Sequence, residues 1–210
     1  MTFHRDILKI DAPQEIDRIS DFIKQQTLAL RKEGAVVGLS GGIDSALSSE
    51  LCVKALGREK VLGLILPERE ANPVSRQFGV RQAEKLGIRT EVVDISATLE
   101  AIGTYNRRDE LVKKIFPEYD GSFRLKMTLP PDILAKDAFN IFSLSIDNAR
   151  GNVKSARLTK DALSGIIAAT DTKQRTRMLY LYYYAEKMNY LVCGTTNRSE
   201  HVQGYFVKYG

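Results

Sequence analysis

The stretch "VVGLSGGIDSALSSELCVKALG", from Val36 to Gly57, constrains the fold more than any other part of this 210-residue chain. An apolar run typical of a buried strand ends at a serine, and Ser-Gly-Gly-x-Asp-Ser follows before a helical pattern begins. Glycines let backbone N–H groups approach oxygens closely, and the start of a helix carries a partial positive charge. The sequence therefore predicts a phosphate-binding loop over 38–45.

The acidic residue in this loop indicates that a cation accompanies the phosphate. Asp44 would repel bound phosphates unless a cation lay between them, and Mg²⁺ prefers carboxylate and phosphate oxygens. No lysine follows the glycines, so the loop is not of the Walker type. Ser40 and Ser45 can add hydroxyl donors. The alternative interpretation is a glycine-rich turn capped by an Asp or Ser side chain.

Strand and helix patterns alternate around the loop. Strand-like runs cover 35–40, 61–67, 90–95 and 190–195, and helical spacing covers 13–33, 44–56 and 172–189. Asn72-Pro73 predicts a capped helix start, and Gly87 predicts the end of that helix. We expect a single α/β domain over 1–210, with an open, parallel, Rossmann-like sheet that carries helices on both faces.

The middle of the chain, 105–170, has no clear strand pattern. It is charged and interrupted by prolines, and "RDELVKKIF" and "DILAKDAFNIFSLSI" have helical spacing. Three roles stay open for it: a lid, an interface element or a different substrate pocket.

Composition narrows the class of partner. The net charge of +5 suits an anionic ligand such as a nucleotide, and no basic run with interleaved aromatics predicts nucleic-acid binding. No run of about 20 apolar residues predicts a membrane span, and the charged start "MTFHRDILKI" is unlike a signal peptide. Cys52 and Cys193 are interpreted as buried, reduced, structural thiols. We expect a cytoplasmic protein.

Two motifs together carry a family resemblance. Ser-Gly-Gly-x-Asp-Ser after a first strand resembles the pyrophosphate loop of the ATP pyrophosphatases, whose fold is adenine nucleotide alpha hydrolase-like. Within that group, "CGTTNRSEHVQGYFVKYG" at 193–210 resembles NAD synthetase. "LPERE" at 66–70 and "TRMLYLYYYA" at 176–185 stand where that family has its adenine-side loop and its dimer helix. The resemblance covers 1–104 and 172–210.

The resemblance implies a carbon–nitrogen ligase that amidates deamido-NAD to NAD through an adenylated intermediate. ATP and ammonia would be consumed, and AMP and pyrophosphate would be released. Ammonia would be free or supplied by a separate glutaminase, and the enzyme would be a homodimer. The chain also lacks the segment with which the family continues after Gly210, which suggests a fragment or a shortened relative.

Site residues follow from the resemblance position by position. It implies ATP contacts at Gly38, Leu39, Ser40, Gly41, Gly42, Ile43, Asp44, Ser45, Arg69 and Thr195. It makes Asp44 and Glu200 the catalytic, magnesium-binding carboxylates, and it assigns deamido-NAD binding to Arg175 and Lys208. The residues alone support part of this set, because Thr195 closes a strand and ligands gather at the carboxyl ends of parallel strands.

Several of these residues also have other interpretations. Glu200 could be a solvated helix residue, and Arg175 and Arg177 could be ordinary helix-surface cations. His201 is given no role. The rival functions are another adenylating ATP pyrophosphatase, similar to GMP synthetase or to a tRNA-modifying enzyme, and a nucleotide-binding or dimerisation module that has lost catalysis.

Overall fold

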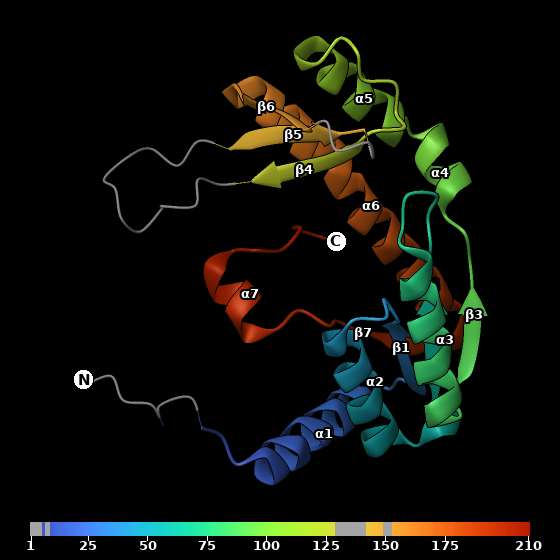
Figure 1. Cartoon of the computed structure of the whole chain (residues 1–210). Coiled ribbons are helices and arrows are strands. Elements are labelled where there is room, and N and C mark those ends of the chain that lie inside the picture. Colours follow the sequence, from blue (N-terminus) through green and yellow to red (C-terminus); the bar gives the residue numbers. More distant parts are fainter. Residues whose placement is uncertain (1–5, 7–8, 129–141, 149–152) are drawn as a thin grey trace. The chain divides into compact units, whose positions relative to one another are not determined.

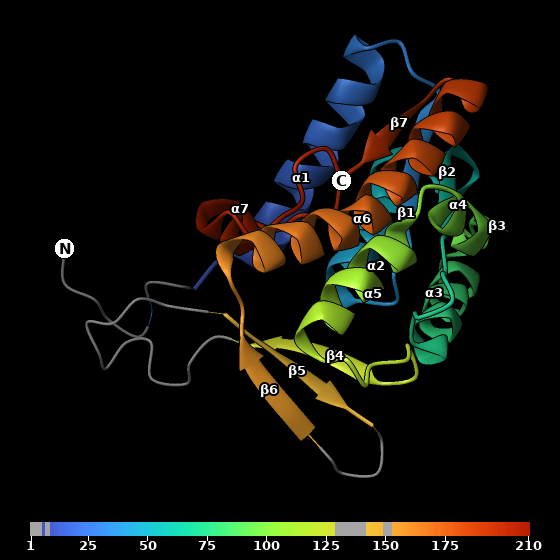
Figure 2. The same cartoon turned by 90° about the horizontal axis from the view of Figure 1, so that it is seen from above.

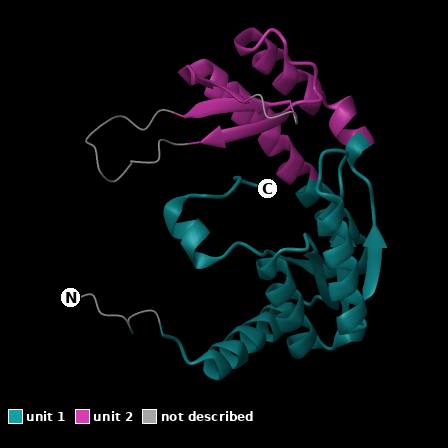
Figure 3. Cartoon of the chain, in the orientation of Figure 1, with its two compact units in different colours: residues 1–96, 177–209 teal, residues 97–176, 210 magenta. Residues whose placement is uncertain are grey.

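The computed structural model describes residues 6, 9–128, 142–148 and 153–210, which form two compact units (Figures 1 and 3). The first unit comprises the residues up to Ser96 together with 177–209, and the second comprises 97–176 and Gly210. The long helix α6 (Lys160–Met188) contributes to both units and can be followed along its whole length in Figure 2. The single domain expected from the sequence stays a prediction.

A parallel sheet of four strands forms the centre of the first unit. Its strands, in spatial order, are β3 (Arg89–Val92), β2 (Val61–Ile65), β1 (Gly34–Gly38) and β7 (Tyr190–Cys193). Every residue of β2 is buried, and so are the first four of β1. Continuous burial of this kind is typical of parallel strands that are covered on both faces. The predicted open parallel sheet is confirmed.

Successive side chains of β1 point to opposite faces of the sheet. Ala35 and Val37 join Cys52 of α2 (Ile43–Leu56) and Ala83 of α3 (Pro73–Leu86) in one buried cluster. Helix α1 (Ala12–Ala29) adds Ile23 to the same cluster. On the opposite face, the side chain of Leu181 in α6 lies 3.6 Å from an ideal Cβ position at Gly38. Helices therefore cover both faces, as predicted.

The helix boundaries follow from local capping. The side chain of Asn72 accepts a hydrogen bond from the Val74 N–H at 3.0 Å, and Pro73 occupies the first helical position of α3. Gly87 ends α3 in the left-handed region at φ 63°. Both predicted helix signals are confirmed. The helix expected to begin at residue 172 is wrong in its start, because α6 begins at Lys160.

The second unit contains a sheet that the sequence analysis missed. Three antiparallel strands pair in the order β4 (Arg124–Thr128), β5 (Ser143–Asp147) and β6 (Val153–Arg157). The helical interpretation of the end of "DILAKDAFNIFSLSI" is wrong, because that end forms β5. The part of that pattern at 132–141 lies outside the described residues.

Burial along β5 explains the error. Leu144 and Ile146 are each 1% exposed, and the residues between and beside them are half-buried. This two-residue period is that of a strand with one covered face. The covered face packs against Val112 of α5 (Thr104–Ile115) and Ile166 of α6. Because α5 covers nearly all of "RDELVKKIF", the helical prediction for that segment is confirmed.

The remaining elements are short. They are a 3₁₀ turn at Arg58–Lys60 (η2), α4 (Ser96–Ala101) and α7 (Arg198–Gln203). Among the helices of the described residues, none combines the length and the apolar character that a membrane span requires.

Candidate functional site

The glycine-rich turn lies at the carboxyl end of β1, between that strand and α2. Gly41 has a left-handed φ of 80°, and a Cβ there would lie 2.4 Å from the Ser75 carbonyl oxygen in the first turn of α3. Only glycine satisfies both conditions. Gly42 precedes α2 and makes no side-chain cap, so no capping side chain covers the first N–H groups of this helix. The turn therefore has the form expected of an anion site.

Two serines hold the turn in shape. Ser45 is 3% exposed, and its Oγ donates to the Gly42 carbonyl at 2.9 Å and lies 3.0 Å from the Ser40 Oγ. The Gly42 N–H in turn donates to the Ser40 Oγ at 3.2 Å. Both hydroxyls thus organise the loop, and a direct contact of either with ATP stays a prediction.

Asp44 and Glu200, the two predicted metal ligands, are connected through Asn197. The Asn197 Nδ2 donates to the Asp44 Oδ1 at 3.2 Å. The Asn197 backbone N–H donates to the Glu200 Oε2 at 3.0 Å, and the Glu200 N–H donates to the Asn197 Oδ1 at 2.9 Å. These last two bonds form a capping box at the start of α7. A side-chain hydrogen bond therefore connects the first turn of α2 to the residue that caps α7.

The other predicted residues are divided between the two units. Thr195 lies half-buried between β7 and α7, and Arg69 is exposed in the loop after β2. Lys208 is exposed, with its Nζ 5.0 Å from the centroid of the Tyr209 ring. These three residues belong to the first unit, as do all the loop residues from Gly38 to Ser45. Arg175 belongs to the second unit, where its NH2 group lies 3.7 Å from the Asp171 Oδ2.

The loop after β2 has two anchors that the sequence analysis did not identify. The Arg177 Nε donates to the Leu66 carbonyl at 3.2 Å. Glu68 is 7% exposed, and its Oε2 accepts a hydrogen bond from the Glu70 N–H at 3.0 Å. Arg177 thereby fastens α6 to the loop that carries Arg69. It is not the ordinary surface cation that the sequence allowed, and no local pattern marks a contact over 111 positions.

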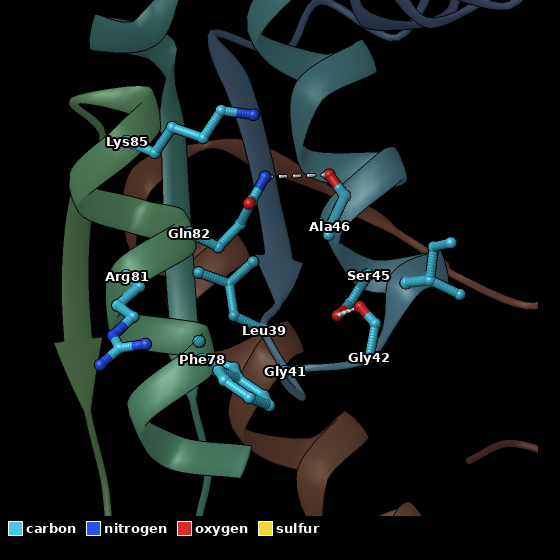
Figure 4. A pocket seen from close by; sticks show the side chains of 11 residues that line it. Leu39, Gly41, Gly42, Ser45, Ala46, Phe78, Arg81, Gln82 and Lys85 are labelled. Atoms are coloured by element: carbon cyan, nitrogen blue, oxygen red, sulfur yellow. Dashed lines mark hydrogen bonds between the residues drawn. The ribbon is translucent and has the colours of Figure 1, made fainter. Parts of the chain in front are cut away.

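A cavity of about 430 Å³ opens between α2 and α3, beside the phosphate loop (Figure 4). The Gln82 Nε2 crosses it to donate to the Ala46 carbonyl at 3.3 Å. Its size is that of a small-molecule pocket. The lining residues are Leu39, Gly41, Gly42, Ile43, Ser45, Ala46, Phe78, Gly79, Arg81, Gln82 and Lys85.

The two cysteines are neighbours although they are far apart in sequence. Both are free thiols, and Cys193 packs against the buried cluster that contains Cys52. A hydrogen bond to Cys193, together with burial, raises the pKa of Cys52, and the same hydrogen bond lowers the pKa of Cys193. Cys52 therefore stays protonated at neutral pH.

The donor set at Asp44 and Glu200 fits a magnesium ion that is shared with a ligand. In the described part of the chain, no three His, Cys, Asp or Glu side chains are grouped so that they could hold a metal ion. Two carboxylates alone do not fill the coordination of Mg²⁺, which is commonly bound by one or two carboxylates together with substrate phosphates and water.

The fold and the loop define the class of protein first. An open parallel sheet with helices on both faces, in which the inner strand β1 runs into Ser-Gly-Gly-x-Asp-Ser, defines an α/β protein with a candidate phosphate-binding loop. The sequence model of the family described as NAD synthase matches residues 15–130 and 132–210. The chain belongs to the NAD synthase family.

Individual relatives agree with this membership. The chain is 42% identical over 205 residues to an NH3-dependent NAD+ synthetase from Mesorhizobium japonicum, and the match covers 97% of this chain and 64% of that protein. It is 41% identical over 210 residues to the enzyme of the same name from Rhizobium meliloti, covering all of this chain and 63% of that protein. The chain thus spans less than two thirds of the length of these curated relatives.

Solved structures support the fold. An NH3-dependent NAD synthetase from Campylobacter jejuni superposes with a TM-score of 0.63 at 24% identity, covering 96% of this chain and 64% of that one. An NMN synthetase from Francisella tularensis gives the same TM-score at 23% identity, covering 96% of this chain and 61% of that one.

Proposed function

We propose that the protein amidates deamido-NAD to NAD, consuming ATP and ammonia and releasing AMP and pyrophosphate. The observation that carries the proposal is the hydrogen-bonded chain from Asp44 through Asn197 to Glu200, set beside a helix start that no side chain caps. The names of the Mesorhizobium and Rhizobium relatives support the same reaction. A cytoplasmic location stays the expectation.

The loop would bind the β and γ phosphates of ATP. The N–H groups in the first turn of α2, from Ile43 to Ser45, would face the phosphate oxygens, which is the interaction that a helix start favours. The N–H groups of Leu39, Ser40 and Gly42 already donate within the protein and would hold the loop in shape. Asp44 and Glu200 would hold Mg²⁺, and the bound ion would supply positive charge that stabilises the departing pyrophosphate. Arg69 and Thr195 would contact the rest of the ATP from the loops after β2 and β7.

The protein would supply no nucleophile of its own. The carboxylate of deamido-NAD attacks the α-phosphorus, pyrophosphate leaves, and ammonia then displaces AMP from the acyl adenylate. The contribution of the chain is to orient the reactants and to place N–H donors where negative charge develops. Arg175 and Lys208 would bind deamido-NAD through its negatively charged groups.

Calorimetric titration of Mg-ATP into Asp44→Ala tests the first part of the proposal. We expect weaker Mg-ATP binding with an unchanged circular dichroism spectrum, because one magnesium ligand is lost. Asp21→Ala is the control, since it removes the same charge from an exposed position on α1. Equal affinities of wild type and Asp44→Ala would exclude the metal role of Asp44.

A product assay on the protein encoded by the complete natural gene tests the reaction. AMP should form with deamido-NAD and ammonia, and it should not form with xanthosine monophosphate, the acceptor expected for a GMP synthetase. Glu200→Gln should lower turnover about a hundredfold, or about 3 kcal/mol, because one charge at the magnesium is removed. ATP binding without AMP formation from either acceptor would support a module that has lost catalysis.

We also propose a homodimer through the second half of α6. Leu179, Tyr182 and Tyr183 are 64%, 54% and 57% exposed and recur at the three- and four-residue spacing of one helix face. Exposed aromatics grouped in this way are typical of interfaces. Sedimentation at micromolar concentration should show a dimer that Tyr182→Glu dissociates, and a wild-type monomer would contradict this arrangement.

A further inference from the structure

The side chain and backbone of Asn197 contact both proposed magnesium ligands. Its amide nitrogen reaches the Asp44 Oδ1, its amide oxygen accepts the Glu200 N–H, and its own N–H reaches the Glu200 Oε2. Two groups of Asn197, its amide nitrogen and its N–H, thus contact two carboxylates from helices that are far apart in the sequence, and its amide oxygen caps α7.

These contacts leave one oxygen of each carboxylate available. In the part of the chain that the structure describes, the Asp44 Oδ2 and the Glu200 Oε1 take part in no hydrogen bond or ion pair. A cation could therefore be bound without breaking the three bonds that Asn197 makes. The bonded oxygens set the direction of the open ones, as partners of metal-binding carboxylates commonly do.

Asparagine is well suited to this position because its side chain has both a donor and an acceptor. Aspartate at 197 would keep the acceptor that caps α7, but it would place a third negative charge against Asp44. Serine at 197 would also keep a capping acceptor, but its hydroxyl is shorter than the amide by one heavy atom. The cap alone therefore does not require asparagine, whereas the cap together with the bond to Asp44 needs one short side chain that both accepts and donates.

We propose that Asn197 is a positioning residue, which holds Asp44 and Glu200 in the orientation that binds the cation accompanying the nucleotide. The inference rests on the proposed function, because it takes both carboxylates to be the magnesium ligands. Asn197 acts through these carboxylates and touches neither the nucleotide nor the reacting atoms in this role.

The experiment measures Mn²⁺ binding in the presence of ATP by electron paramagnetic resonance, with Mn²⁺ as the probe for Mg²⁺. Asn197→Ser should weaken Mn²⁺ binding about tenfold, since lost partners of metal ligands commonly reduce affinity by this much. The matched control is Asn72→Ser, which makes the same substitution at the capping position of α3. It should leave Mn²⁺ binding unchanged.

A double-mutant cycle separates positioning from a structural role. In the Asp44→Ala background, Asn197→Ser should have no further effect on Mn²⁺ affinity, because its partner is already absent. An equal loss in both backgrounds would overturn the proposal, and so would a wild-type affinity in Asn197→Ser. If Asp44→Ala itself binds Mn²⁺ and ATP like the wild type, the proposed magnesium site fails and the role of Asn197 fails with it.

Discussion

The two units of the chain contain sheets of opposite kinds. In the first unit, the neighbouring parallel strands β1 and β2 are buried along almost their whole length, whereas β3 and β7 at the two edges of the sheet are half-buried or exposed. In the second unit, only one face of the antiparallel sheet is covered by helices, so buried and half-buried residues alternate along β5. A parallel sheet brings all its strand carboxyl ends to one edge, whereas antiparallel strands alternate in direction. This difference explains why the loops after β1, β2 and β7 carry nearly all the candidate residues.

Truncating one core leucine in each sheet is the strongest test of this comparison. Leu64→Ala in β2 and Leu144→Ala in β5 each remove a fully buried side chain, and each should lower the free energy of unfolding by about 2–5 kcal/mol. Hydrogen exchange read by mass spectrometry should show lost protection in β1–β3 for the first variant and in β4–β6 for the second.

The same exchange data decide whether the chain is one cooperative domain. Loss of protection confined to the unit that carries the substitution indicates two cooperative units. Equal loss in both sheets, whichever leucine is changed, would confirm the single domain that the sequence predicted.

The second largest effect concerns the phosphate loop. Gly41→Ala places a Cβ 2.4 Å from the Ser75 carbonyl and forces alanine into a left-handed conformation. The two penalties together should weaken Mg-ATP binding by about 3 kcal/mol, or about a hundredfold. Gly57→Ala is a matched control, because Gly57 has a similar φ of 85° but open space around its Cβ position. That variant should lose stability and keep nucleotide affinity, and similar affinities in the two variants would contradict the role of the loop.

The first unit was predictable from the sequence because its signals are local. The apolar runs, the Asn72-Pro73 start and Gly87 each report on their own neighbours, and the structure has the corresponding elements. The capping box of α7 was also visible in principle, since Asn197 precedes Glu200 by three positions. The contact of Asn197 with Asp44 was not, because no pattern reports on a partner 153 positions away.

The sheet of the second unit was not predicted because each of its strands has only five residues. The residues of β4 and β6 are mostly exposed, and each strand carries two basic residues, so apolar periodicity gives little signal there. The apolar residues at 144 and 146 in β5, together with Phe142 just before it, also fit the end of a helical pattern when they are combined with the preceding residues. The hydrogen bonds that β5 makes with β4 and β6 stabilise the strand instead of a helix, and a local sequence pattern does not report on these partners.

A smaller effect is expected where α6 fastens the loop after β2. Arg177→Met removes the hydrogen bond to the Leu66 carbonyl and should weaken ATP binding by about 1.5 kcal/mol, or about tenfold, since the donor is charged. Arg175→Met changes the same residue type two positions earlier on the same helix. It should spare ATP binding and weaken deamido-NAD binding. Calorimetry with ATP and with deamido-NAD gives the two affinities of each variant. If both variants lost the same affinity for each ligand, Arg177 would not act through the loop after β2.

The smallest effect lies on the surface of the second unit, in the ion pair between Glu118 and Lys154. The hydrogen bond from Lys154 lowers the pKa of Glu118, so the pair adds stability above the unfolded-state pKa and loses it as the pH falls through the lower folded-state pKa. Glu118→Gln should therefore shift Tm by about 1 °C or less at pH 7, because both side chains are exposed, and the shift should disappear as the pH falls through the folded-state pKa of Glu118. Glu110→Gln, an exposed position on α5, removes the same charge without this ion pair and should show no such pH dependence. A Tm difference between Glu118→Gln and the wild type that persists at low pH would mean that the carboxyl group acts through packing and not through its charge.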